Sequence, residues 1–331
     1  MDAETAEQLT IGDRPFYGQN QARELVGRSL AGDRLPHAYL FRGPEGVGKQ
    51  LFARGLAAAI NCKVSHGLSA CGKCSSCIKF AAGSHPDFLS VAPEKGAIKI
   101  GTIRELIRKL SFAPYEAELR VVLIEDVHTM RQEAANSLLK TLEEPPDNNL
   151  LILTADSSGA LLQTIISRCQ VIPFYALTVP ETTTILRTVA PEMDEKTAQL
   201  LARLAEGSPG KALLFYQREL VAFCLELVAL LADPEASGDR AVGKLLQMAE
   251  RMAALKDDLP RLLGLVRLWI RDSLLEGVGQ DGGTGFGIAR KDWNNKQYFA
   301  KLQAVDRAEK ELGRNCNRTL VCEVLLFQLN S

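Results

Sequence analysis

The stretch Gly43–Lys49, which reads GPEGVGK, has the residue types of a loop that binds phosphate. It fits the pattern G-x-x-x-x-G-K, with glycines at Gly43, Gly46 and Gly48, after an expected strand and before an expected helix. Backbone N–H groups in such a loop form an anion-binding concavity, and Lys49 would reach the terminal phosphates. The pattern predicts a nucleotide loop; a strand–helix turn without a ligand is the alternative.

Two departures from the usual pattern concern the hydrolysis step. Gln50 stands where a serine or threonine hydroxyl would bind Mg²⁺, and an amide oxygen is a weaker ligand. An expected buried strand over Val121–Ile124 ends in Glu125-Asp126, whereas the usual order is Asp then Glu. The reversal moves each carboxylate by about one methylene, and a misplacement of about 1 Å can cost roughly 10²-fold in rate. We therefore expect a degenerate site that can hold ATP or ADP without efficient turnover.

A group of four cysteines follows the helix that the loop opens. They are Cys62, Cys71, Cys74 and Cys77. Two successive C-x-x-C steps with a preceding thiol can surround a tetrahedral Zn²⁺, and four protein ligands make the site structural. The alternatives are an iron–sulfur cluster, although the C-x₃-C-P continuation is missing, and a loop without metal. His66 and His85 are possible substitute ligands that the fourth cysteine makes unnecessary.

Strands and helices alternate as far as about residue 175. Strands are expected at His37–Phe41, Asp87–Val91, Arg120–Asp126, Leu150–Thr154 and Cys169–Phe174, with helices at 18–35, Gly48–Asn61, Ile103–Phe112 and Gln132–Glu143. This alternation predicts an α/β fold in which a parallel sheet carries helices on both faces.

Beyond Phe174 the sequence becomes helical. Residues 176–217 suggest a small helical unit with a turn at Gly207–Gly210, and residues 218–331 an all-helical domain. Two apolar stripes support helices there, formed by Leu259, Leu263, Val266, Ile270 and Leu274, and by Leu320, Val324 and Phe327. The glycine-rich segment 277–287 is expected to be a connecting loop.

Composition limits the function classes. The net charge of −1 excludes a global attraction to DNA, so any nucleic-acid contact needs a local patch. The acidic start of the chain is unlike a signal peptide, and no apolar run approaches the roughly 20 residues that cross a bilayer. Eight cysteines, four of them clustered, suit a reducing cytoplasm with one metal site.

Taken in order, these motifs resemble a known family. The phosphate loop, the cysteines, the paired acids, the helix Glu133–Pro146 (EAANSLLKTLEEPP), the strand Leu150–Ala155 and the triplet Ser167-Arg168-Cys169 are similar to the bacterial DNA polymerase III clamp loader, an AAA+ ATPase assembly. The resemblance covers essentially the whole chain. It implies an AAA+ P-loop domain at 1–175, a helical lid at 176–217 and an oligomerising C-terminal collar at 218–331.

The resemblance also implies a function. The assembly opens a ring-shaped sliding clamp and places it on primed DNA, with ATP held at subunit interfaces. Gln50 makes the chain more similar to a stator-type subunit than to the gamma/tau motors. Its expected partners are the gamma/tau and delta subunits of a hetero-pentamer, with no membrane. Arg168 would be an arginine finger that acts in trans on ATP held by a neighbouring motor; an ordinary surface arginine is the alternative.

A third departure lies in the lid. Motor subunits carry an arginine after Gly-Ser-x, where this chain has Gly210 followed by Lys211. Two other functions are alternatives to the stator role. One is a working gamma/tau-like ATPase that tolerates these departures. The other is a zinc-ribbon nucleic-acid binder, for which Lys63, Lys73 and Lys79 provide only a modest basic face.

Overall fold

The computed structural model describes residues 10–11, 14–32, 34–64, 67–156, 161–232, 239–277, 286, 293–314 and 316–330. The chain divides into two compact units, residues 1–185 with 207–210 and residues 186–206 with 211–331. His66 and most of the predicted connecting loop at 277–287 lie outside the described residues. Among the described helices, none combines the length and the apolar character that a membrane span requires.

A five-stranded parallel sheet forms the centre of the first unit, in the order β4-β5-β6-β3-β7. The strands are β3 (Ala38–Arg42), β4 (Phe88–Val91), β5 (Arg120–Ile124), β6 (Asn149–Ala155) and β7 (Gln170–Pro173). Leu40 of β3 lies opposite Leu153 on one side and Val171 on the other. Every residue of β5 and β6 is buried, which explains their almost continuous apolar sequence. A separate two-stranded sheet joins β1 (Thr10–Ile11) to β2 (Arg14–Pro15).

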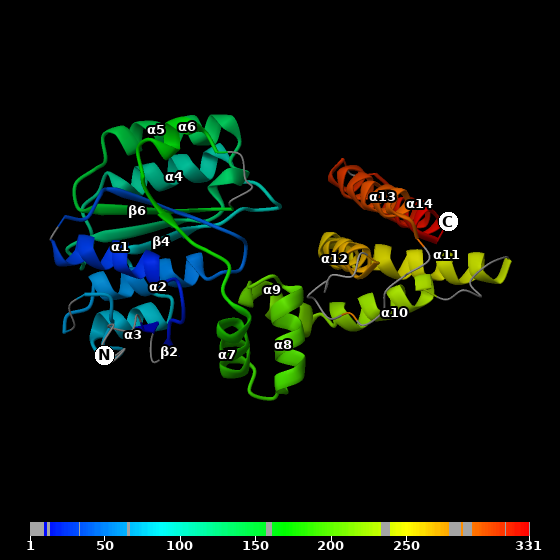
Figure 1. Cartoon of the computed structure of the whole chain (residues 1–331). Coiled ribbons are helices and arrows are strands. Elements are labelled where there is room, and N and C mark those ends of the chain that lie inside the picture. Colours follow the sequence, from blue (N-terminus) through cyan, green and yellow to red (C-terminus); the bar gives the residue numbers. More distant parts are fainter. Residues whose placement is uncertain are drawn as a thin grey trace. The chain divides into compact units, whose positions relative to one another are not determined.

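Helices cover both faces of the sheet, as Figure 1 shows. One face carries α1 (Asn20–Ala31), α2 (Lys49–Ile60) and α3 (Ser75–Ala81); the other carries α4 (Ile100–Leu110), α5 (Gln132–Glu143) and α6 (Gln163–Ile166), and a 3₁₀ turn, η1 (Val127–Thr129), follows β5. Tyr39 and Phe41 pack in the first core, whereas Ala38 and Leu40 pack in the second. This alternation is what a strand with two covered faces requires. The predicted parallel sheet with helices on both faces is confirmed.

The rest of the described chain is helical, as predicted. Its elements are α7 (Val179–Val189), α8 (Glu195–Leu204), α9 (Pro209–Gln217), α10 (Leu220–Ala232), α11 (Asp239–Ala254), η2 (Lys256–Asp258), α12 (Leu259–Gly277), α13 (Asn295–Gly313) and α14 (Arg318–Asn330).

The two predicted apolar stripes differ in burial. On α12, Leu259, Leu263, Val266 and Ile270 are buried. On α14, however, Leu320, Val324 and Phe327 are 59%, 43% and 40% exposed. The opposite face of α14 is the buried one, and it contains Val321, Cys322, Leu325, Leu326 and Leu329. The α14 stripe is therefore a surface of the isolated chain, not part of its core.

A buried ion pair shapes the loop between α4 and β5. Asp87 and Arg120 are 0% and 7% exposed, and Nη2 of Arg120 lies 3.3 Å from Oδ1 of Asp87. The carboxylate accepts backbone hydrogen bonds of 2.7, 2.8 and 3.0 Å from Tyr115, Glu116 and Ala117. The guanidinium donates to the carbonyls of Lys109, Phe112 and Ala113. Apart from Nε of Arg120, which is buried without a hydrogen-bond partner, the polar atoms of both charges are thus satisfied by the loop as well as by each other, which a buried pair needs if it is to stabilise.

We expect Asp87→Asn to lower the free energy of unfolding by about 2–3 kcal/mol, because an amide N–H₂ would face backbone N–H donors and leave them unsatisfied. Burial alone would raise the pKa of the Asp87 carboxyl, but the N–H donors of Glu116, Tyr115 and Ala117 and the charge of Arg120 hold that pKa below its usual value. The stabilisation is therefore present above the unfolded-state pKa of about 3.9 and is lost as pH falls through the folded-state pKa. Urea unfolding at pH 7 and pH 3 should show the difference between variant and wild type shrinking at the lower pH.

Candidate functional site

The predicted phosphate loop joins β3 to α2, and Lys49 is the first residue of that helix. Gly48 has a φ of +100°, a backbone conformation that favours glycine. A Cβ atom at this position would also lie 3.2 Å from the ring of Phe16, so the turn requires glycine. Lys49 is buried, and its Nζ donates to the carbonyls of Gly43 and Pro44 at 2.7 and 2.6 Å. The lysine thus lies against the carbonyls of its own loop, in a conformation that fits an anion-binding turn.

Gln50 and Glu125 do not form an Mg²⁺ site together in this structure. Gln50 is exposed in the first turn of α2. The Glu125 carboxylate instead accepts hydrogen bonds from the Arg54 guanidinium at 3.1 Å and from the Ser90 hydroxyl at 3.0 Å. Arg54 and Ser90 therefore both donate to the same oxygen of Glu125, Oε1.

Asp126, the second acid of the pair, interacts electrostatically with the phosphate loop. Its φ of +49° is left-handed, a conformation in which Asp is enriched, and its N–H donates to Oγ1 of Thr154 at 3.0 Å. Burial raises the pKa of the Asp126 carboxyl, and the positive charges of His128 and Lys49 act against that rise. The Lys49 charge thus acts on the Asp126 carboxyl and opposes the rise of its pKa.

The turn before α9 packs directly on the phosphate loop. The Gly210 N–H donates to the Gly46 carbonyl at 2.9 Å, and the Ser208 hydroxyl donates to the Glu45 carbonyl at 2.7 Å. A Cβ atom at Gly210 would lie 2.9 Å from Cα of Gly46, which is closer than real Cβ contacts come. Position 210 therefore has no room for a side chain in this arrangement.

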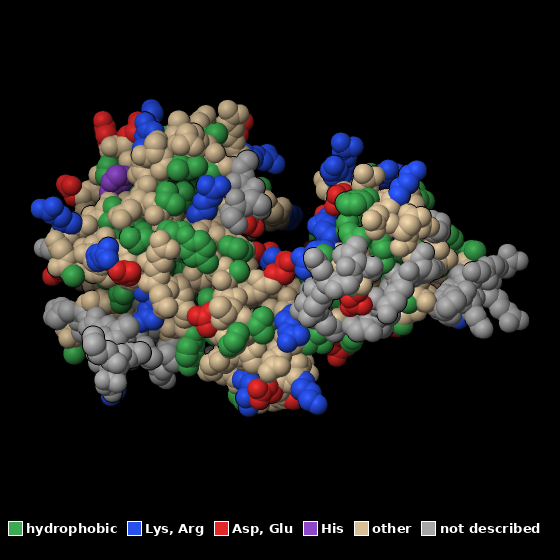
Figure 2. Space-filling model, viewed as in Figure 1, with side chains coloured by type: hydrophobic (Ala, Val, Ile, Leu, Met, Phe, Trp, Pro, Cys, Tyr) green, Lys and Arg blue, Asp and Glu red, His purple; other side chains and the backbone are tan. Residues whose placement is uncertain are grey.

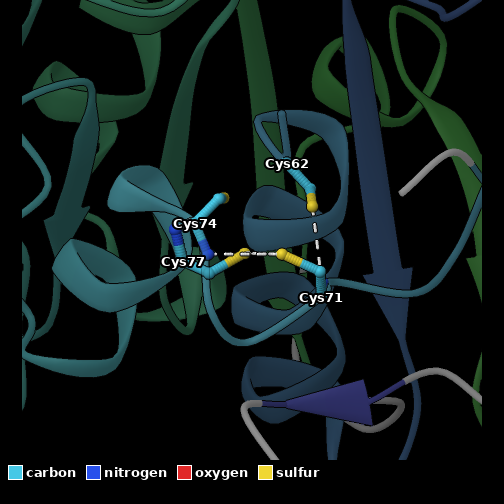
Figure 3. A group of neighbouring side chains, drawn as sticks. All are labelled: Cys62, Cys71, Cys74 and Cys77. Carbon is cyan, nitrogen blue, oxygen red and sulfur yellow. Dashed lines mark hydrogen bonds between the residues drawn. The ribbon is translucent and has the colours of Figure 1, made fainter. Parts of the chain in front are cut away.

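The four clustered cysteines converge, as Figure 3 shows. Their sulfur atoms all lie within 4.8 Å of one another, and Sγ of Cys71 is 3.9 Å from Sγ of Cys77. A tetrahedral zinc with Zn–S bonds of about 2.3 Å places its sulfurs about 3.8 Å apart. Backbone N–H groups of Cys71, Cys74 and Cys77 donate to the sulfurs of Cys62, Cys71 and Cys74 respectively. The cluster can therefore hold one metal ion such as zinc with four protein ligands.

The thiols of the cluster differ in their affinity for protons. Burial raises the pKa of Cys77 to about 12, and its hydrogen bond with the Cys74 thiol adds to the rise. Burial also acts to raise the pKa of Cys74, but backbone N–H groups of Cys77 and Lys63 donate to its sulfur and the net shift is downward. A metal ion must therefore displace a tightly held proton from Cys77, so binding should weaken as pH falls.

His85 is not part of the metal cluster. Its Nε2 lies 3.2 Å from the Ser76 hydroxyl, its Nδ1 accepts from the Asp87 N–H, and its ring stacks on Phe80 with centroids 4.3 Å apart. Burial lowers the pKa of this imidazole. The side chain acts as a packed, neutral core group, and the four cysteines supply the ligand set without it.

Arg168 lies at the surface, between α6 and β7. Its side chain is 32% exposed, and Nη2 donates to Oε1 of Glu143 at 2.6 Å. Nη1 donates to the Thr164 carbonyl at 2.9 Å and lies 3.3 Å from the Ser167 hydroxyl. The guanidinium is thus accessible yet held in one orientation at the edge of the sheet, since β7 is an edge strand.

Comparison with known proteins shows the family to which this chain belongs. A family model described as DNA polymerase III, delta subunit, matches residues 18–178. The delta′ subunit of DNA polymerase III from Pseudomonas aeruginosa is 30% identical over 322 residues, which cover 88% of this chain and 91% of that protein. The chain belongs to the DNA polymerase III delta′ subunit family.

Other relatives match over shorter stretches. The delta′ subunit of Escherichia coli is 35% identical over 221 residues, which cover 65% of each protein. The tau subunit of E. coli is 34% identical over 200 residues, 59% of this chain and 31% of tau. The match to the Bacillus subtilis delta′ subunit likewise covers 57% of that protein. The chain thus spans from 31% to 65% of the length of these relatives.

Three side chains of this delta′-family site were not found from the sequence. The sequence contains a weak signal for Arg54, because this residue lies four positions after Gln50 and therefore shares a face of α2 with it. Ser90 and Glu143 have none, since their contacts with Glu125 and Arg168 depend on which elements the fold places side by side.

Proposed function

We propose that this chain is a stator-type subunit of the bacterial DNA polymerase III clamp loader and supports ATP-driven loading of the sliding clamp on primed DNA. In this proposal it turns over no ATP itself and supplies Arg168 to a neighbouring gamma/tau motor. It assembles with gamma/tau and delta subunits in the cytoplasm. The observation that carries the proposal is the occupied Glu125 carboxylate, bound by Arg54 and Ser90.

Two observations support the absence of efficient hydrolysis in this proposal. Mg²⁺ needs an oxygen at the position after the loop lysine and a free carboxylate at the end of β5. Gln50 is exposed, and Glu125 is paired with a guanidinium. Because Lys49 and the loop conformation are retained, we propose that ATP or ADP can bind there without being hydrolysed.

The surface around Arg168 supports a role at a subunit interface. Leu162 and Val171, which flank α6 and Arg168 in sequence, are 38% and 40% exposed. Exposed apolar residues and arginine both occur in protein–protein interfaces. An accessible guanidinium with exposed apolar residues near it in the sequence suits a finger that enters a neighbour's nucleotide site.

The remaining parts receive structural roles in the proposal. Zinc held by the four cysteines stabilises the loop before α3; residues 176–217 form a lid and residues 218–331 a collar. The exposed stripe of Leu320, Val324 and Phe327 supports the collar assignment, because an unpaired apolar stripe on a helix is a natural helix-packing surface.

Contact with DNA is proposed to occur through the assembly. On the face shown in Figure 2, lysine and arginine side chains are interspersed with aspartate and glutamate. The net charge of −1 agrees with this mixture. Such a surface does not by itself neutralise a row of phosphates.

The test uses the full chain alone with Mg²⁺-ATP and primed DNA. We expect no phosphate release above background, because Gln50 offers only a weak metal ligand and Oε1 of Glu125 is held by Arg54 and Ser90. Titration with a fluorescent ADP analogue separates an empty loop from an occupied but inactive one. Phosphate release at the rate of a gamma/tau motor would instead support the alternative, a working clamp-loader ATPase.

A further inference from the structure

The guanidinium of Arg168 is fixed at two different nitrogens. Glu143 binds Nη2 at 2.6 Å, and the Thr164 carbonyl binds Nη1 at 2.9 Å. A guanidinium is planar and rigid, so two anchors on separate nitrogens set the direction of its remaining donors. Without the Glu143 contact, the anchors that the described residues still give the group would be those on Nη1, from Thr164 and Ser167.

The carboxylate of Glu143 is unfavourable for its own helix. Glu143 is the last residue of α5, and an acidic side chain there faces the negative end of the helix dipole. Helix stability would favour a neutral or basic residue at this point. The favourable interaction that the carboxylate makes is the one with Arg168.

The ion pair between Arg168 and Glu143 leaves some N–H donors of the guanidinium available. Arginine has five N–H groups, and the contacts with Glu143, Thr164 and Ser167 use three of them. Nε–H and one N–H of Nη2 have no partner among the described residues. These are the groups that a phosphate oxygen from outside the chain can accept while the contact with Glu143 is kept.

We propose that Glu143 is a positioning residue for Arg168: it holds the guanidinium at the surface with two N–H donors directed outward, ready for the phosphates of a neighbouring subunit. The inference rests on the proposed function of Arg168. Glu143 touches no nucleotide in this scheme and acts only through the arginine. Its contribution is preorganisation, since fixing a charged donor beforehand removes reorganisation at the moment of reaction.

The test replaces Glu143 in the full chain, within a reconstituted loader in which only the motor facing Arg168 can hydrolyse ATP. We expect Glu143→Gln to lower kcat by about two- to fivefold, the range that an exposed ion pair provides, with KM for ATP unchanged. Glu144→Gln is the matched control, because this adjacent acid makes no ion pair with any described residue, and it should leave kcat unchanged.

Two further measurements separate positioning from a structural effect. The unfolding temperature of Glu143→Gln should equal or exceed that of the wild type, because the change removes an unfavourable helix–charge contact. In the Arg168→Ala background, Glu143→Gln should cause no further loss of kcat, since the group it positions is gone.

The outcomes also separate this inference from the proposed function. If Arg168→Ala lowers kcat while Glu143→Gln leaves it unchanged or raises it, the positioning role is wrong and the finger stands. If Arg168→Ala leaves kcat unchanged, the finger and the positioning role are both wrong. An equal loss from Glu143→Gln with and without Arg168 would also overturn the inference.

Discussion

Arg168→Ala should lower ATP hydrolysis at the neighbouring motor's site by about 10³-fold or more, the contribution that an arginine finger makes to phosphoryl transfer. The guanidinium is exposed at the sheet edge and keeps two donors available for phosphate oxygens. Alanine removes the positive charge that would stabilise the transition state, while the apolar neighbours that would hold the interface remain. Assembly of the complex should therefore be unaffected.

The measurement requires a loader in which the phosphate-loop lysine is replaced in every motor except the one facing this chain, so that other sites do not mask the loss. Phosphate release is then followed with clamp and primed DNA present. Arg28→Ala is the matched control, because Arg28 is also an exposed arginine paired with a glutamate, Glu24. Arg168→Lys should recover only part of the rate, since lysine keeps the charge but not the planar fork. A normal rate with Arg168→Ala would remove this residue from the mechanism.

Replacing Cys74 and Cys77 together by serine should abolish metal binding and unfold the segment around α3. Structural zinc sites in small peptides contribute about 10–16 kcal/mol of apparent binding free energy, so this is the largest stability effect that we expect. Serine at Cys74 can still cap α3, where the Cys74 sulfur now accepts from the Cys77 N–H. The loss can therefore be attributed to the metal and not to the helix cap.

Elemental analysis should find one zinc per wild-type chain and none in the double variant. Cys316→Ser is the control, because Cys316 is exposed and lies outside the cluster. Zinc should also dissociate more readily as pH falls, since protons compete with the metal for the cysteine sulfurs. Iron in the wild-type protein, or the absence of any metal, would contradict the zinc assignment.

Local patterns in the sequence were sufficient for most of the elements. The predicted strand Arg120–Asp126 contains β5, and the helix predicted from Gln132 to Glu143 matches α5. Both signals are periodic and depend only on neighbouring residues. Helix α3 was missed, because its seven residues, SSCIKFA, are too few to establish a period and its start depends on the Cys74 cap.

The clustering of the four cysteines could also be predicted from the sequence. Its ligands lie within a short segment, so their spacing alone restricts how far apart the sulfurs can be. The hydrogen bonding of Glu125 could not be predicted from the sequence. Its partner Arg54 is 71 residues away in the chain and reaches it only because α2 lies against the sheet. The same applies to Ser208 and Glu45, which are separated by 163 residues.

The sequence by itself determined the loop, the clustering of the four cysteines, the alternating elements and the family resemblance, because each rests on residue types at fixed short spacings. Only the tertiary structure decided that Arg54 occupies Glu125, that Glu143 holds Arg168, and that the stripe of Leu320, Val324 and Phe327 faces outward. Helix α14 is apolar on both faces, so periodicity could not tell which face its neighbours cover. Contacts between distant residues follow from the order in which strands and helices pack, and no local pattern encodes that order.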